Sequence, residues 1–201
     1  GGSGICIVRY SIAEVAENVA KATGGNISFS GGKTYHAFIQ GSATFTVTSA
    51  IPSAEVLLVA GGGGGGSYIG GGGGAGGYTY NSSIAFPVAS YPITVGAGGV
   101  GNSQYVPPTA NSQTSGTKGG NSVITHPSGP YSVEGGGLGA GYNNPGGGND
   151  GGPGGSGGGG GNGNPAGGSG GSATGSGTGN AGGDGLGGGG ADGGGGGGGG
   201  G

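Results

Sequence analysis

The sequence predicts a mainly β fold. We expect a small β-sandwich with one short N-terminal helix, and a glycine-rich region packed as polyglycine II rods. Three observations lead to this prediction. Short β-branched and aromatic runs alternate with turn residues through the first 134 residues, one amphipathic run interrupts them, and glycine makes up 70 of the 201 residues. Glycine is concentrated in residues 135–201, where it exceeds half of all residues.

The first two elements are a strand and a helix. Residues 5–10, which read ICIVRY, form a β-branched run bounded by glycine and are typical of a strand. Ser11 and Glu14 have the spacing of a capping box, which satisfies free amide groups at the start of a helix. Apolar residues then follow at helical spacing until Gly24 and Gly25. Residues 11–24 are therefore expected to form a connector helix.

Residues 25–134 are expected to form the β-sandwich, with a glycine-rich insertion at residues 61–77. Residues 44–48 alternate between threonine and apolar side chains, which predicts that one face of this strand is buried. Residues 56–59 are all apolar, which predicts burial on both faces. Pro87 and Pro92 lack a backbone donor, so we expect them in edge strands. The predicted strands are residues 5–10, 27–30, 34–40, 44–49, 55–60, 78–80, 84–88, 91–95, 122–125 and 131–134.

Residues 135–201 contain almost no large apolar side chains, so side-chain burial cannot fold them. Ordering the backbone costs on the order of 1–2 kcal/mol per residue, and only dense backbone hydrogen bonding could offset that cost. A flexible spacer and an array of polyglycine II helices are the two alternatives. The other residues of this region are small or turn-forming, which favours short rods joined at corners.

Composition argues against several functions. Four Lys and Arg residues form no basic patch, so no nucleic-acid partner is expected, and no apolar run is long enough for a membrane span. The isolated histidines and irregularly spaced aspartates predict no metal site and no cofactor. No nucleophile and base have a recognisable spacing, so we expect no catalytic residues and no enzyme. His36 lies within a predicted strand and is expected to be exposed or satisfied in the core.

Tyrosines are the remaining candidates for a binding site. Several of the nine tyrosines border glycine or turn segments, where exposed rings could stack on sugars. The candidate glycan contacts are Tyr68, Tyr78 and Tyr142. The alternative is that these rings fill gaps between the rods and the sandwich.

Five motifs in residues 25–99 indicate a family. They are GNISFSGG at 25–32, TFTVT at 44–48, AEVLLVA at 54–60, GGAGGY at 73–78 and YPITVGAGG at 91–99. Together they resemble the glycine-rich domain family found in phage tail-fibre and related surface proteins. A more distant resemblance is to phage receptor-binding adhesins built from packed polyglycine II helices. Neither resemblance implies catalysis or a cofactor; both imply a location outside the cell, on its surface or on a virion.

The order of elements departs from that family. A strand such as residues 5–10 resembles the closing element after the last glycine run, yet here it comes first, and the chain stops on residues 193–201. The chain would then be one period of a tandem array, or it would donate this strand to a neighbour. The assembly residues would be those of the strand itself: Ile5, Cys6, Ile7, Val8, Arg9 and Tyr10.

The leading hypothesis is therefore a non-enzymatic structural subunit of an extracellular or virion fibre. Copies of the chain would be its partners, joined head to tail by strand donation. The alternative is a tail-fibre adhesin that binds host surface glycans. A passive disordered spacer is the third interpretation.

Overall fold

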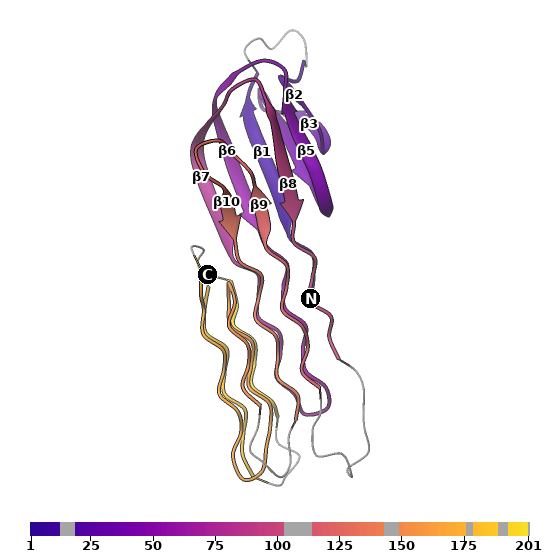
Figure 1. Cartoon of the computed structure of the whole chain (residues 1–201), viewed down its shortest axis with the longest axis vertical. Helices are drawn as coiled ribbons and strands as arrows, with labels where there is room; N and C mark the ends of the chain where they lie inside the picture. Colours follow the sequence, from indigo (N-terminus) through magenta and orange to yellow (C-terminus); the bar gives the residue numbers. More distant parts are fainter. Residues whose placement is uncertain (13–18, 103–113, 143–148, 176–178, 189–192, 201) are drawn as a thin grey trace.

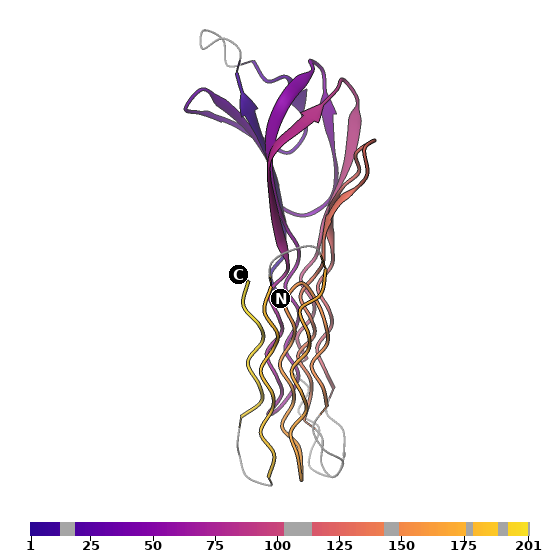
Figure 2. The same cartoon turned by 90° about the vertical axis from the view of Figure 1, so that its left-hand side faces the viewer.

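A computed structural model describes residues 1–12, 19–102, 114–142, 149–175, 179–188 and 193–200. Two antiparallel five-stranded sheets face each other at one end of an elongated molecule (Figures 1 and 2), and the described residues contain no helix. The first sheet has the order β3 (Asn26–Ser30), β4 (Lys33–Phe38), β1 (Ile5–Ser11), β6 (Ile51–Val59) and β7 (Tyr78–Phe86). The second has the order β10 (Tyr131–Val133), β9 (Ser122–Ile124), β8 (Ser90–Val95), β5 (Gly41–Val47) and β2 (Ala22–Thr23).

Alternate side chains of both sheets form one core. Phe45 lies at its centre, with its ring packed edge to face against Phe86 at 5.4 Å and against His36 at 5.0 Å between centroids. The predicted alternation of residues 44–48 is confirmed, because Phe45 and Val47 are buried while Thr44 is exposed. Most predicted strands correspond to observed ones, but residues 78–80 and 84–88 belong to the single strand β7, β6 begins four residues earlier than predicted, and β2 was not predicted as a strand.

The predicted connector helix over residues 11–24 is wrong at both described ends. Ser11 is the last residue of β1, and Ala22–Thr23 form β2; residues 13–18 lie outside the described part of the chain. Long-range contacts hold the second half extended, since the Lys21 amide donates to the Tyr10 hydroxyl and the Lys21 carbonyl accepts from the Thr48 amide. A capping box signals only a local preference, and these contacts override it.

Two predictions about strand environment also need correction. Pro92 is in β8, which lies between β5 and β9 rather than at an edge. The Pro92 carbonyl accepts a hydrogen bond from the Thr125 amide, so the side of Pro92 that lacks an amide hydrogen also faces β9. Strand β9 has only three residues, and its pairing with β8 ends at Ile93, so Pro92 interrupts no regular ladder there. In β6, Val56 and Leu58 are buried, but Leu57 and Val59 are only half-buried on the outer face.

The strands lead directly into glycine-rich segments. We call residues 1–4, 61–77, 96–102, 114–121, 135–142, 149–175, 179–188 and 193–200 the glycine array. Its segments run side by side below the sheets (Figures 1 and 2). The Ala60 amide donates to the Gly77 carbonyl, which continues the pairing of β6 with β7 into the array, and the Gly4 amide donates to the Gly96 carbonyl.

Backbone hydrogen bonds in the array repeat every three residues. Gly61 and Gly64 donate to one neighbouring segment, at Gly120 and Thr117, with N–O distances of 3.0 and 2.9 Å. Gly63 and Gly66 donate to another segment, at residues 74 and 71, and Gly62 donates to a third, at residue 2. One segment therefore binds three neighbours on different sides, whereas a β-strand binds two.

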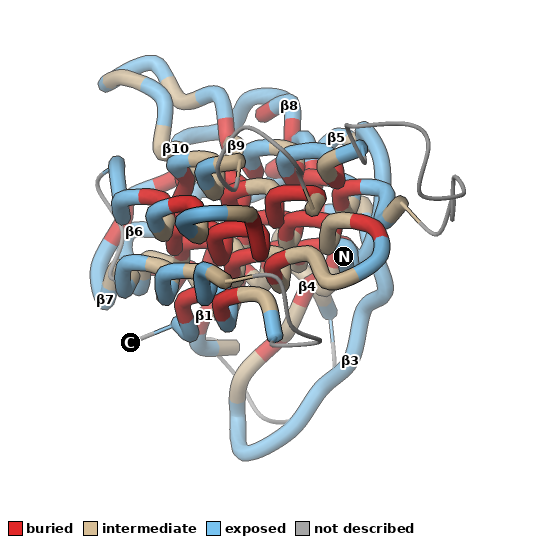
Figure 3. Tube along the Cα trace, turned by 90° about the horizontal axis from the view of Figure 1, so that it is seen from below, coloured by how far each residue is buried: buried red, intermediate tan, exposed pale blue. Residues whose placement is uncertain are grey.

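At many positions in the interior of the array there is no space for a side chain. Residues 154–163 are all buried, and the array seen from below has buried backbone at its centre and exposed backbone around it (Figure 3). A Cβ atom added at Gly158 would lie 1.8 Å from the carbonyl oxygen of Leu138, and one at Gly137 would lie 1.9 Å from that of Gly152. Glycine is required at these positions because the backbones approach so closely.

Candidate functional site

Strand β1 contains the six predicted assembly residues and lies in the middle of the first sheet. It is antiparallel to β4 on one side, from Cys6 opposite Phe38 to Ser11 opposite Lys33, and to β6 on the other. Cys6, Val8 and Tyr10 point into the core and are buried. Burial raises the pKa of the Cys6 thiol to about 12, so this thiol stays protonated and unreactive at neutral pH.

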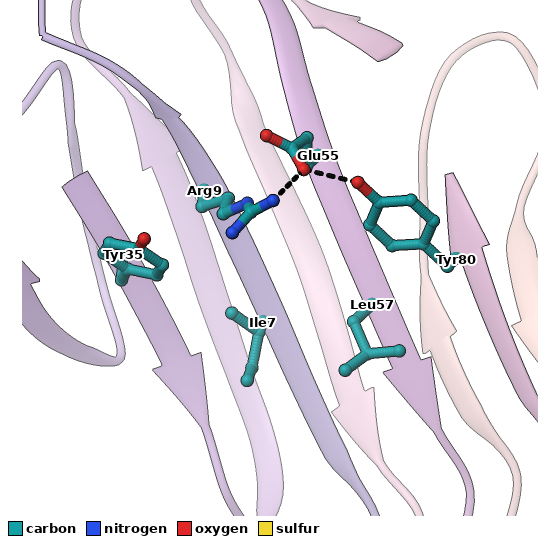
Figure 4. A pocket seen from close by; sticks show the side chains of 6 residues that line it. All are labelled: Ile7, Arg9, Tyr35, Glu55, Leu57 and Tyr80. Carbon is teal, nitrogen blue, oxygen red and sulfur yellow. Dashed lines mark hydrogen bonds and ion pairs between the residues drawn. The ribbon is translucent and has the colours of Figure 1, made fainter. Parts of the chain in front are cut away.

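The outward side chains of β1 line a pocket (Figure 4). Ile7 and Leu57 of β6 lie opposite each other and form an apolar floor. Tyr35 of β4 and Tyr80 of β7 stand on either side of it. Four adjacent strands of the first sheet thus build the pocket, and Arg9 and Glu55 close one end of it.

Three donors converge on the Glu55 carboxylate. Arg9 pairs with one oxygen, which also accepts from the Tyr80 hydroxyl, and the Lys33 ammonium lies 2.6 Å from the other oxygen. The hydrogen bonds from Arg9, Lys33 and Tyr80 lower the pKa of Glu55 to about 2. The hydrogen bond to Glu55 raises the pKa of Arg9, and the hydroxyls of Tyr35 and Tyr80 add to this effect. The carboxylate is therefore ionised and fully engaged at neutral pH, with one positive charge in excess around it.

The inward face of the same strands contains a buried polar chain. The Lys21 amide donates to the Tyr10 hydroxyl at 3.0 Å, the hydroxyl lies 3.0 Å from Nε2 of His36, and Nδ1 of His36 lies 2.8 Å from the Gly24 carbonyl. A carbonyl can only accept, so Nδ1 has the proton and Nε2 accepts from Tyr10. Burial lowers the pKa of His36. Of the two environments predicted for His36, exposed or satisfied in the core, the structure shows the second.

The three tyrosines predicted to contact glycans are not all close together. Tyr68 and Tyr142 meet in the array with ring centroids 5.4 Å apart at an interplanar angle of 78°. Tyr68 belongs to the turn between segments 61–66 and 71–77, at the end of these segments away from the sheets, and the residue is 55% exposed. Tyr78 starts β7, where the array meets the sheets, so it does not join the other two.

Sequence reasoning missed the pocket. Its members come from four strands, so no single motif contains them. The one available signal was the apolar run of residues 56–59, because an outward Leu57 in an otherwise alternating strand is unusual for a solvated face. Among the described residues there is no cluster of three or more potential metal ligands, and no helix that is long and apolar enough to cross a membrane.

A family model described as a glycine-rich domain matches residues 37–201. The chain belongs to the glycine-rich domain family. The match to this family includes β5 to β10 and the array from residue 61 onward, whereas β1, β2, β3 and most of β4 lie before it. No curated protein and no solved structure matches the chain.

Proposed function

We propose that this glycine-rich domain chain is a non-enzymatic structural subunit of an extracellular or virion fibre, such as a phage tail fibre. Copies of the chain join head to tail by exchanging β1. The observation that carries the proposal is that the first strand of the chain is a central strand of its sheet, with ladders to both β4 and β6. Without β1, those two strands have a gap that only an equivalent strand can fill.

A single chain fills this gap with its own β1. In a fibre, the same strand would occupy the gap of the next copy and form the same ladder, connected to its own sheets through residues 12–21. The backbone hydrogen bonds would be unchanged in number, so exchange alters little of the bonding that holds β1 in its sheet. Buried Cys6, Val8 and Tyr10 would then anchor one copy in the core of another.

The proposal assigns the glycine array to packed polyglycine II rods. The three-residue repeat of its hydrogen bonds supports this assignment, because polyglycine II has three residues per turn and no internal hydrogen bonds. The close backbone approach at residues such as Gly158 also supports it, since only glycine allows such packing. Rods bonded on several sides make a stiff, elongated body, which is what a fibre subunit needs.

Cross-linking tests strand exchange directly. Ile7 and Leu57 face each other across β1 and β6 on the outer face, and opposite residues in antiparallel strands have Cα atoms about 4.5–5.5 Å apart, within disulfide range. One tagged chain carries Ile7→Cys and the other Leu57→Cys, both with Cys6→Ala. After the two chains are refolded together, we expect a disulfide between them.

The control pairs the Ile7→Cys chain with a chain that carries Ser132→Cys on β10, in the opposite sheet. We expect no specific cross-link from that mixture. The double variant with both cysteines in one chain reports pairing within a copy. If only that double variant forms the Ile7–Leu57 disulfide, at every concentration, the copies do not exchange β1.

A second candidate function is a tail-fibre adhesin that binds host surface glycans at the end of the array. It is favoured by the Tyr68–Tyr142 pair and by the backbone of Tyr68, whose φ of 54° lies in the left-handed region. A non-glycine residue there is strained and is often found at functional positions. Glycan-array binding that is lost in Tyr68→Ala, but kept in a Val100→Ala control, supports this function. An intact fibre that binds no glycan contradicts it.

A further inference from the structure

The outer faces of the two sheets differ in chemistry. The outward positions of β5 and β8 in the second sheet are mostly serine and threonine, such as Thr44, Ser90 and Thr94. The outward positions of the first sheet are apolar or aromatic near its centre, and there they form the pocket floored by Ile7 and Leu57. A solvated sheet face does not need this apolar surface, so the pocket has the features of a binding site.

We propose that this pocket binds an acidic sugar within an oligosaccharide chain. The floor suits the C–H face of a pyranose ring, and the tyrosines on either side suit stacking against sugar rings (Figure 4). The four strands from β4 to β7 span about 14 Å, at about 4.8 Å per spacing, so the surface is wider than one ring. A short oligosaccharide fits such an open surface better than a single small molecule.

Charge selects an acidic sugar rather than a neutral one. Arg9 and Lys33 supply two positive charges against the single carboxylate of Glu55. The Arg9 side chain is 37% exposed, and a guanidinium has five N–H donors, more than its contacts with Glu55, Tyr35 and Tyr80 use. A sugar carboxylate lying above Ile7 could take the remaining donors of Arg9 and neutralise the excess charge.

The pocket does not depend on the fibre proposal. Ile7 and Arg9 come from β1, while Tyr35, Glu55, Leu57 and Tyr80 come from its neighbours. If β1 is exchanged, the pocket is shared by two copies; otherwise it belongs to one. The site also differs from the Tyr68–Tyr142 pair, which belongs to the array.

Two matched probes test the proposal on the 201-residue chain: a β-1,4-linked glucuronate tetramer and cellotetraose. They differ only in the oxidation of C6. Calorimetric titration should show the acidic tetramer binding at least about tenfold more tightly than cellotetraose, because a charge-assisted hydrogen bond is worth about that factor. Arg9→Gln should remove this preference, and higher salt should weaken it.

Two further variants locate the site. Tyr35→Ala should weaken binding of the acidic tetramer without changing the charge of the pocket. If Arg9→Gln fails to fold, this variant still tests whether the tetramer binds in the pocket. Thr94→Ala, on the outer face of the second sheet, should leave binding unchanged. Equal affinity for the two tetramers, no binding at millimolar concentration, or binding unaffected by both pocket variants would overturn the proposal. The proposal would also be overturned if the chain forms a dimer that the Leu57→Asp substitution dissociates, because a second copy of the chain would then cover the pocket.

Discussion

The two halves of this molecule are stabilised in opposite ways. In the sheets, side chains form the core, and backbone hydrogen bonds connect only neighbouring strands within each sheet. In the glycine array, the buried material is the backbone itself, and each segment bonds to neighbours on several sides. A chain can therefore build an interior without apolar side chains, provided that its backbones approach closely enough to exclude any Cβ atom.

The largest effect should come from removing a core side chain of the sheets. Phe45→Ala deletes the ring that contacts Phe86 and His36, so we expect a loss of about 3–5 kcal/mol in the free energy of unfolding. Urea denaturation measures it. The adjacent Thr44→Ala, on the exposed face, should change stability by no more than about 0.5 kcal/mol. Similar losses for both variants would mean that Phe45 is not central to the core.

The array should respond to the addition of a single methyl group. Gly158→Ala places a Cβ atom 1.8 Å from the Leu138 carbonyl oxygen, so we expect a loss of about 1–3 kcal/mol from overpacking. Gly195→Ala, 2.0 Å from the Gly183 carbonyl oxygen, should also destabilise. Gly196→Ala is the control, because its Cβ atom meets nothing within 4 Å. Thermal unfolding that ranks Gly195→Ala and Gly196→Ala as equal would contradict close packing of the array.

The polar chain through His36 should make the sheets sensitive to mild acid. The folded pKa of His36 lies below its ordinary value of 6.5, so the unfolded chain takes up the proton first. The contribution of neutral His36 to the free energy of unfolding is therefore fully present above pH 6.5, and it decreases as the pH falls from there toward the folded pKa. His36→Phe should flatten this part of the pH profile measured by urea denaturation. An unchanged slope in that variant would assign the acid sensitivity to another group.

A smaller effect is expected from the ion pairs on the outer face. The pKa of Glu55 is lowered from 4.5 to about 2, so its contribution to stability is present above pH 4.5 and is lost as the pH falls toward 2. Glu55→Gln should reduce the slope of stability against pH in that window. Because the group is near the surface, added salt should reduce the slope of the unmodified chain as well. A slope insensitive to both changes would show that the three donors do not stabilise the carboxylate.

The sequence predicted the strands well because their patterns are local. Alternation at residues 44–48 and the β-branched run at residues 5–10 each identify a strand without knowledge of its partners. The connector helix failed because contacts from Tyr10 and Thr48 hold Lys21 extended. Those contacts depend on the whole fold, which a capping box does not sense.

The candidate sites were harder to predict for the same reason. The pocket combines side chains from four strands, and Tyr68 meets Tyr142 only because two distant array segments lie next to each other. Glycine content suggested close backbone packing, but only the structure shows which carbonyl each glycine faces. The pairing of β1 with β4 and β6 likewise follows from topology rather than from any property of residues 5–10 alone.

The central claim is that the array is an ordered body held by its backbone, and amide hydrogen exchange tests it most directly. Residues 154–163 are buried and bonded to neighbouring segments, so their amides should exchange about as slowly as those of the core strand β6. Exchange within seconds across residues 154–163, as in a flexible glycine-rich spacer, would contradict the account.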